Sequence, residues 1–180
     1  MKGDVMTFEI APVGLSAYLV LVAIAVFVVC VPLFWLNKEG MAFAMQKSLI
    51  GLVLASPVIL GIAYTMHDNA FELSGKNILV RADSFYHYTR SLDEFDLSHA
   101  QIGSYESIPT AQLKWRRNGL GLPGVSAGHF STQDGKAIFV ALTDRSLVLY
   151  LPAKSGTSLL VSVSNPNAVL DALKRAKSTS

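Results

Sequence analysis

The sequence predicts two transmembrane α-helices followed by a β-rich domain that a single C-terminal helix closes. Long apolar runs near the N-terminus, a low content of charge and a change of texture near residue 69 predict this fold class. Only 16% of the 180 residues are charged, against about 25% in soluble proteins, so part of the chain must suit lipid. We expect residues 1–68 to hold an N-terminal tail and a transmembrane helical hairpin, and residues 69–180 to form the domain.

Two uncharged runs are long enough to cross a bilayer, and they predict helices at about 11–36 and 48–66. At 1.5 Å per residue such runs match a hydrocarbon core of about 30 Å, whereas a buried core helix has only about 10 to 14 apolar residues. Residues 37–40 are expected to turn the chain between them. A cleaved signal peptide is the alternative for the first run, but Asp4 and Glu9 precede it in place of a basic cluster.

Small residues and prolines punctuate the two runs. Ser48, Gly51 and Ala55 recur at three- and four-residue spacing in the second run, and small residues at such spacing let a neighbouring helix approach closely. Simple tolerance of small residues by lipid explains the pattern equally well, so both readings stay open. Pro32 and Pro57 lie inside the runs, and we expect each to bend or loosen its helix.

Basic residues flank the two runs almost evenly. Lys38 and Lys47 lie in or beside the connecting loop, whereas Lys2, Lys76 and Arg81 lie on the side of the termini. Because cytoplasmic segments carry the excess of lysine and arginine, the slightly larger count predicts cytoplasmic termini and a cytoplasmic domain.

The sequence after residue 69 is typical of short antiparallel strands separated by turn residues. A glycine-containing turn at 74–76 predicts a tight hairpin between the first two strands. The expected strands are 71–73, 78–80, 85–89, 125–132, 137–143, 147–151 and 158–162. Asn165 and Pro166 then predict the start of a helix that runs to about Lys177. The simplest assembly is a barrel closed by this helix.

Four short segments in the second half of the domain carry a family resemblance. They are N-G-L-G-L-P-G at 118–124, A-G-H-F at 127–130, T-D-R-S at 143–146 and V-L-Y-L-P at 148–152. In this order they resemble the bacterial pleckstrin-homology-like (PH) domain family, in which an N-G-x-G-x-P-G segment precedes a G-x-F strand, a T-D-R turn and a V-x-Y-L-P-like strand. Asn165 stands where that family more often has an acid. The resemblance covers residues 69–177.

The resemblance implies a PH-like barrel of about seven antiparallel strands capped by one C-terminal helix, commonly attached to membrane helices. It also implies a multi-pass protein of the bacterial cell (inner) membrane, and no settled activity. Specific recognition of inositol phosphates is not expected, because PH domains that perform it carry basic residues in a long first loop, and here that loop is only 74–76.

No pattern of catalytic or metal-binding residues stands out. The single cysteine, Cys30, excludes an intramolecular disulfide and a cysteine-rich zinc site. The histidines never form a metal-binding pair at helical spacing; they are His67, His87, His99 and His129. We therefore predict no catalytic residue, no metal and no cofactor. A hydrolytic or metal-dependent enzyme remains a third reading, because absence of a motif is not absence of activity.

The most suggestive polar feature is the basic segment, which comprises Lys114, Trp115, Arg116 and Arg117. Basic residues beside an anionic membrane contribute about 1 kcal/mol each, and tryptophan is favoured at headgroup depth. The basic segment could therefore contact lipid or a partner. The alternative is a strand edge protected by charge, with Trp115 packed inward.

Two functions compete on this basis. The first is a non-enzymatic, membrane-anchored PH-like interaction module that binds a protein partner or self-assembles at the membrane. The second is a sensor of anionic lipid headgroups that uses the basic segment. A net charge of +2 is too small for a nucleic-acid binder, so the expected partners are the lipid bilayer, a membrane protein or a second copy of the chain.

Overall fold

The computed structural model describes residues 5–35 and 40–178. The chain divides into a helical unit, Leu15–Thr65, and a β-rich unit made of Met1–Gly14 together with Met66–Ser180. The prediction grouped residues 1–68 with the helices, but the described part of the N-terminal tail belongs to the β-rich unit.

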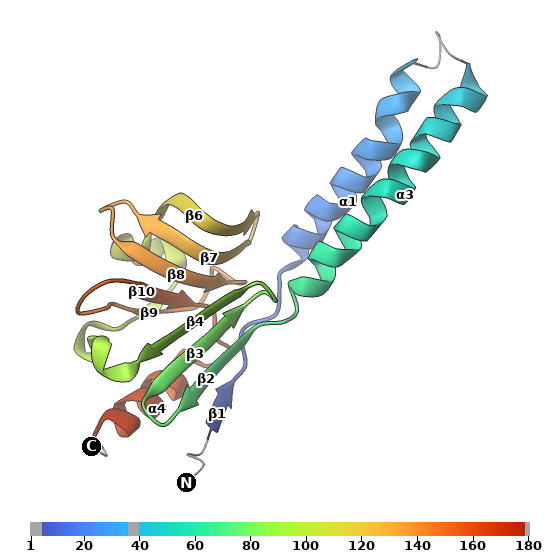
Figure 1. Ribbon diagram of the computed structural model, residues 1–180. Coiled ribbons are helices and arrows are strands. Elements are labelled where there is room, and N and C mark those ends of the chain that lie inside the picture. Colours follow the sequence, from blue (N-terminus) through green and yellow to red (C-terminus); the bar gives the residue numbers. More distant parts are fainter. Residues whose placement is uncertain (1–4, 36–39, 179–180) are drawn as a thin grey trace. The chain divides into compact units, whose positions relative to one another are not determined.

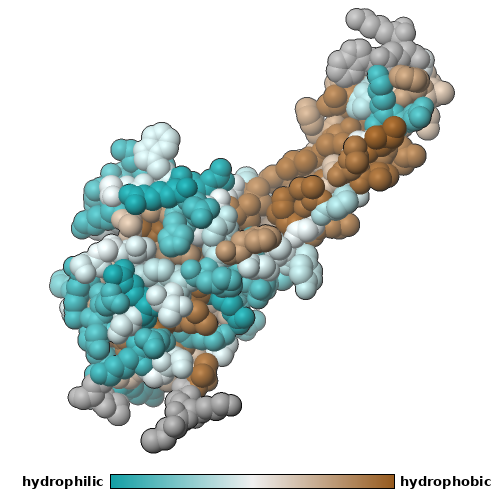
Figure 2. All heavy atoms as spheres, in the orientation of Figure 1, coloured by the Kyte–Doolittle hydropathy of each residue, from teal (hydrophilic) through white to brown (hydrophobic). Residues whose placement is uncertain are grey.

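The helical unit contains α1 (Leu15–Cys30), a short 3-10 helix η1 (Val31–Trp35) and α3 (Met41–Thr65). Two helices, Leu15–Phe34 and Met41–Thr65, are long and apolar enough to cross a membrane, and their surface is largely apolar (Figure 2). The first helix begins later than predicted because the segment before it pairs with strands. The second begins earlier, since Met, Ala and Gln favour helix. Of the predicted turn, residues 37–39 lie outside the described residues.

The two prolines act differently. The α-helix α1 ends at Cys30 and continues as 3-10 helix around Pro32, as expected of a residue that lacks an N–H and clashes with the preceding turn. Pro57 stays inside α3 and frees the carbonyl of Val53. The hydroxyl of Ser56 donates to that carbonyl at 3.2 Å, which is how serine compensates for proline in apolar surroundings.

The first sheet of the β-rich unit has four antiparallel strands in the order β1-β2-β3-β4, with β1 at its outer edge (Figure 1). The strands are β1 (Val5–Phe8), β2 (Ala70–Ser74), β3 (Asn77–Ala82) and β4 (Tyr86–Ser91). The predicted hairpin is present, and Gly75 adopts the positive φ of +57° that its turn requires.

The second sheet has six strands in the order β5-β9-β10-β8-β7-β6. They are β5 (Gln101–Gly103), β6 (Leu113–Leu122), β7 (Val125–Thr132), β8 (Ala137–Leu142), β9 (Val148–Leu151) and β10 (Ser158–Val161). Short 3-10 helices connect the two sheets and lead into β6: η2 (Leu92–Glu94), η3 (Leu97–His99), η4 (Tyr105–Ser107) and η5 (Pro109–Ala111).

The strand count and the pairing correct the predicted barrel. The described residues form ten strands in two sheets instead of about seven antiparallel strands, and β10 runs parallel to β8. The parallel pair arises because β9 does not fold back beside β8 but leaves a place that β10 fills between them. The predicted combination of two apolar helices, a β domain and a C-terminal helix is confirmed.

The central strands of the six-stranded sheet, β8, β9 and β10, are buried on both faces, which explains why they are apolar without alternation. On β8, Phe139 and Ala141 face the core shared with the four-stranded sheet, whereas Ile138 and Val140 face a second cluster. The segment around η4 and η5 covers that second cluster with Tyr105, Ile108 and Ala111.

The final helix α4 (Pro166–Ser178) confirms its prediction. The side chain of Asn165 accepts a hydrogen bond from the backbone N–H of Ala168 at 3.1 Å, as an N-cap residue does. Val169, Ala172 and Leu173 are buried against the shared core.

The N-terminal segment is held by both sheets. Strand β1 pairs with β2, and Ile10 then forms an isolated bridge with Val163, two residues after the end of β10. The backbone N–H of Ala11 donates to Ser162 at 2.7 Å, and its carbonyl accepts the hydroxyl of Thr143 at 2.5 Å. The β-rich unit is therefore built from chain on both sides of the helices in the sequence.

Candidate functional site

The basic segment lies on β6, the edge strand of the six-stranded sheet. Lys114, Trp115, Arg116 and Arg117 are all exposed. Trp115 is 68% exposed, so the expectation that it packs inward is wrong. The other part of that alternative, a position on a strand edge, agrees with the structure.

The basic segment is irregular and has unpaired charges. Its pairing with β7 shifts register between Leu113 and Trp115 and again between Arg116 and Asn118, so β6 is bulged twice. Among the described residues, no carboxylate forms an ion pair with any of the three cations. Bulges and charge make an edge a poor template for a further strand. A partner would therefore engage the side chains rather than extend the sheet.

The glycines of the family-like segments serve packing. A Cβ on Gly119 would overlap the carbonyl oxygen of Ala127, and one on Gly128 would lie 2.5 Å from the carbonyl oxygen of Asn118. The backbones of β6 and β7 thus approach each other where only glycine fits. These glycines hold the bulged edge in place rather than line a site.

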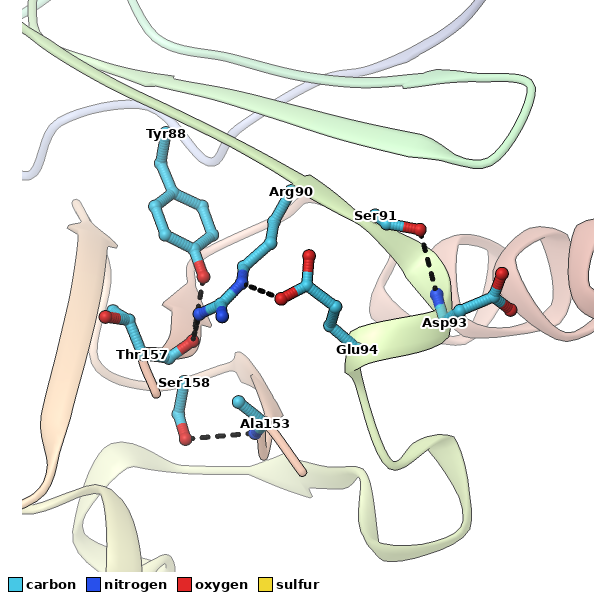
Figure 3. Close-up of polar contacts among 8 residues, drawn as sticks. All are labelled: Tyr88, Arg90, Ser91, Asp93, Glu94, Ala153, Thr157 and Ser158. Atoms are coloured by element: carbon cyan, nitrogen blue, oxygen red, sulfur yellow. Dashed lines mark hydrogen bonds and ion pairs between the residues drawn. The ribbon is translucent and has the colours of Figure 1, made fainter. Parts of the chain in front are cut away.

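A polar cluster joins the end of β4 to the loop after β9 (Figure 3). The Tyr88 hydroxyl donates to the carbonyl of Thr157 at 2.7 Å, and Arg90 donates to the same carbonyl at 3.4 Å. The Arg90 Nε donates to the Glu94 carboxylate at 2.6 Å. We name these four residues the polar clasp.

The polar clasp fixes a loop and offers little chemistry. Burial raises the pKa of the Tyr88 hydroxyl, and the Arg90 guanidinium opposes this only in part. The phenol therefore stays protonated near neutral pH and acts as a donor. The hydrogen bonds of Tyr88 and Arg90 go to the Thr157 carbonyl and the Glu94 carboxylate, which are themselves parts of the folded domain. The polar clasp therefore has the character of a structural link between the two sheets.

Asp96 and His99 form a second polar group at η3. The Ser98 hydroxyl donates to one carboxylate oxygen of Asp96 at 2.5 Å, and His99 Nδ1 lies 2.7 Å from the other. The hydrogen bond from Ser98, then that from His99, lowers the pKa of Asp96 to about 2. Because this pKa is lowered, the interaction is present above the ordinary carboxyl pKa and is lost as pH falls through about 2.

Replacing Ser98 with alanine is expected to raise the pKa of Asp96 toward its ordinary value of 3.8, because the strongest donor to the carboxylate is lost. A carbon-13 NMR titration of the Asp96 carboxyl measures this. Ser155→Ala, in an exposed loop, serves as control and should leave the midpoint unchanged. A wild-type midpoint near 3.8 would contradict the structure.

The histidines do not assemble a metal site. In the described ranges 5–35 and 40–178, no three His, Cys, Asp or Glu side chains gather as metal ligands would. His129 packs edge-on against Phe139, with ring centroids 5.0 Å apart, while His67 and His87 are exposed.

The small residues of α3 lie at the contact between the helices. The Ser48 hydroxyl donates to the carbonyl of Val29 on α1 at 2.8 Å. A Cβ on Gly51 would lie 3.1 Å from the Val28 side chain. Ala55 is half-buried. Ser48 and Gly51 therefore contact the partner helix of the hairpin.

One feature that the sequence analysis missed is the end of the β-rich unit at which the chain passes to the helices. We call it the connector end; it comprises residues 11–14 and 66–69 and the turns 83–85, 122–124 and 143–147. Asn69 accepts a hydrogen bond from the backbone N–H of Asp83 at 2.9 Å, and Ser84 donates to Asp68 at 3.2 Å. Beside them Phe85 is 72% exposed. The sequence feature that could have indicated this end of the unit is the aromatic residue Phe85 beside the polar residues Asp83 and Ser84.

Comparisons with known proteins identified no similar protein. No family model, curated protein or solved structure matches the chain.

Proposed function

We propose that this protein is a non-enzymatic, membrane-anchored binding module, in which two membrane-spanning helices hold a PH-like β domain and the basic segment meets a protein partner. The observation that carries the proposal is the exposed Trp115 among three unpaired cations. Tryptophan and arginine are the residues most enriched among those that dominate binding energy at protein interfaces.

The exposure of the helices supports the membrane anchor. Only 11% and 6% of their most apolar stretches are buried, whereas a core helix of a soluble protein is mostly buried. A cleaved signal sequence is a poor alternative for the first helix, because the segment before it is paired with β2 and with residues after β10.

The paired N-terminal segment also constrains the topology. Since β1 and β2 are neighbours in one sheet, both ends of the hairpin must lie on the same side of the membrane. The slight excess of basic residues near the termini favours the cytoplasmic side of a bacterial inner membrane, with two crossings.

A PH-like relationship draws support from where the family-like segments lie. The N-G-x-G-x-P-G segment forms the end of β6 and its turn, G-x-F lies in β7, and T-D-R leads into β9. The C-terminal helix α4 also agrees with the single capping helix that the resemblance implies. The parallel pairing of β8 and β10 departs from the all-antiparallel barrel that the resemblance implies.

Position along β6 favours a protein over lipid as the partner of the basic segment. Leu113 begins β6 opposite Thr132, at the end of the sheet away from the connector end. Arg117 lies five residue steps before Leu122 on β6, so it is about 16 Å from the connector end along a straight strand. This distance exceeds the screening length of about 8 Å at physiological salt. Charge complementarity points to an acidic protein surface, on another protein or on a second copy.

A photo-crosslinking amino acid placed at Trp115 of the full chain in native membranes tests the proposal. We expect one discrete protein adduct that Arg116→Glu removes, because reversing the charge repels an acidic partner. Lys136→Glu, an exposed lysine in the β7–β8 turn, is the matched charge control and should leave the adduct intact.

The mass of the adduct separates the readings. An adduct of twice the chain mass indicates self-assembly, and another discrete mass indicates a partner. Adducts with lipid alone would overturn the proposal in favour of the headgroup sensor. The proposal would also be overturned if the crosslinker gave the same adducts when it replaced Thr89, an exposed residue of β4, because the contact would then not be specific to the basic segment.

A further inference from the structure

We infer that Phe85, the last residue of the β3–β4 turn, inserts into the lipid headgroup region and fixes how the β-rich unit lies on the bilayer. The inference rests on the proposed membrane anchor, but not on the basic segment or its partner. It assigns a lipid-contacting role to a turn that is separate from the basic segment.

The β3–β4 turn is tied to the connection that leads out of α3. The hydrogen bonds from Asp83 to Asn69 and from Ser84 to Asp68 hold it against that connection. Asp83 has a φ of +64° and is buried, so the turn has a defined shape. Phe85 is therefore presented by a fixed turn rather than by a loose loop.

Chain length keeps this turn close to the membrane surface. Asp68 is the third residue after Thr65, the last residue of α3, and three residues span at most about 11 Å. A second connection, through residues 11–14, holds the same end of the unit by the bond between Ala11 and Thr143. Two short connections at one end restrict how far that end can move from the bilayer.

The chemistry of the connector end fits a hydrophobic contact with the interface rather than attraction to anionic lipid. Phe85 is 72% exposed, and Leu147, in the neighbouring 143–147 turn, is 39% exposed. Tryptophan and tyrosine are enriched where membrane meets water, and phenylalanine and leucine are typical of the apolar face that interfacial helices bury at the headgroup boundary. The formal charges in the three turns are those of Asp83, Asp144 and Arg145, which do not add up to a basic surface.

Tryptophan fluorescence in vesicles tests the inference on the full chain. Trp35→Phe and Trp115→Phe remove both native tryptophans, and Phe85→Trp then supplies a single reporter. In phosphatidylcholine vesicles, lipids brominated near the top of the acyl chains are expected to quench its emission at least twofold. Quenching should not increase when phosphatidylglycerol is added.

Two matched reporters make the outcome decisive. Gln133→Trp, exposed in the β7–β8 turn at the opposite end of β7, should not be quenched. Leu54→Trp, exposed within α3, reports whether the hairpin is inserted and should be quenched by bromine deeper in the bilayer.

Quenching at position 54 without quenching at position 85 would overturn the inference while the membrane anchor stands. Absence of quenching at both positions would overturn the anchor as well. Quenching at position 85 that requires phosphatidylglycerol would overturn the hydrophobic contact in favour of charge.

Discussion

Gly128→Ala is expected to destabilise the β-rich unit by about 3 kcal/mol or more, a large share of the roughly 5 to 15 kcal/mol that stabilises a typical domain. Gly128 has a φ of +108°, a conformation that residues with a side chain rarely adopt. A Cβ there would also lie 2.5 Å from the carbonyl oxygen of Asn118 and 2.7 Å from the Cα of Gly119. Because both neighbours are backbone atoms of β6, the clash can be relieved only by separating β6 from β7.

Gly135→Ala is the matched control for Gly128→Ala. Gly135 also has a positive φ, +78°, but no atom lies within 4 Å of its added Cβ. Its replacement should cost only the backbone strain, about 1 to 2 kcal/mol. Pulse proteolysis of the full chain in detergent across a urea series compares the two variants. Equal losses of stability would mean that β6 and β7 do not approach closely at this point.

Phe139→Ala is expected to lower the free energy of unfolding by about 3 to 5 kcal/mol, as for other buried phenylalanines. Phe139 is fully buried on β8 and stacks on Tyr88 of the four-stranded sheet at a centroid distance of 4.9 Å. Its removal leaves a cavity between the two sheets and takes the packing support from the phenol of the polar clasp. The same urea series measures the loss.

Phe85→Ala makes the same deletion on the surface and serves as control for Phe139→Ala. Since Phe85 is mostly exposed, its loss in detergent should change stability by no more than about 0.5 kcal/mol. Comparable losses for the two variants would show that Phe139 is not at the centre of the core.

The glycine result bears on how the family-like segments are understood. Gly119 on β6 pairs with Gly128 on β7. The segments that contain these glycines therefore serve to pack the edge strand β6 closely against β7. The proposed binding residues precede Gly119 on β6, whereas Gly128 lies on the neighbouring strand β7. Substitutions at the glycines should therefore affect folding first, whereas substitutions at Trp115 and Arg116 should affect binding alone.

Local rules were sufficient for the elements that the sequence predicted. Uncharged length alone indicated both apolar helices, Asn165 and Pro166 marked the start of α4, and Gly75 marked the β2–β3 turn. Each of these depends on a backbone or solvation preference that a few neighbouring residues express, without reference to distant parts of the chain.

The strands expected from the sequence did not include β1, β5 or β6, although a strand edge was one interpretation of the basic segment on β6. The first two are only four and three residues long, and each is a strand only because a partner strand supplies hydrogen bonds. Strand β6 contains cations, glycines and two bulges, which remove the alternation on which strand prediction relies. Its edge position left Trp115 in solvent, which the residue type alone did not indicate.

By itself, the sequence determined that the chain has an apolar helical pair, a β-rich region and a capping helix, because these follow from local hydrophobicity and backbone preference. Only the tertiary structure decided that the N-terminal segment joins both sheets, that β10 enters beside β8, and that Phe85 lies at the connector end. Those features depend on pairing between residues far apart in the sequence, and such pairing is selected by the packing of the whole unit.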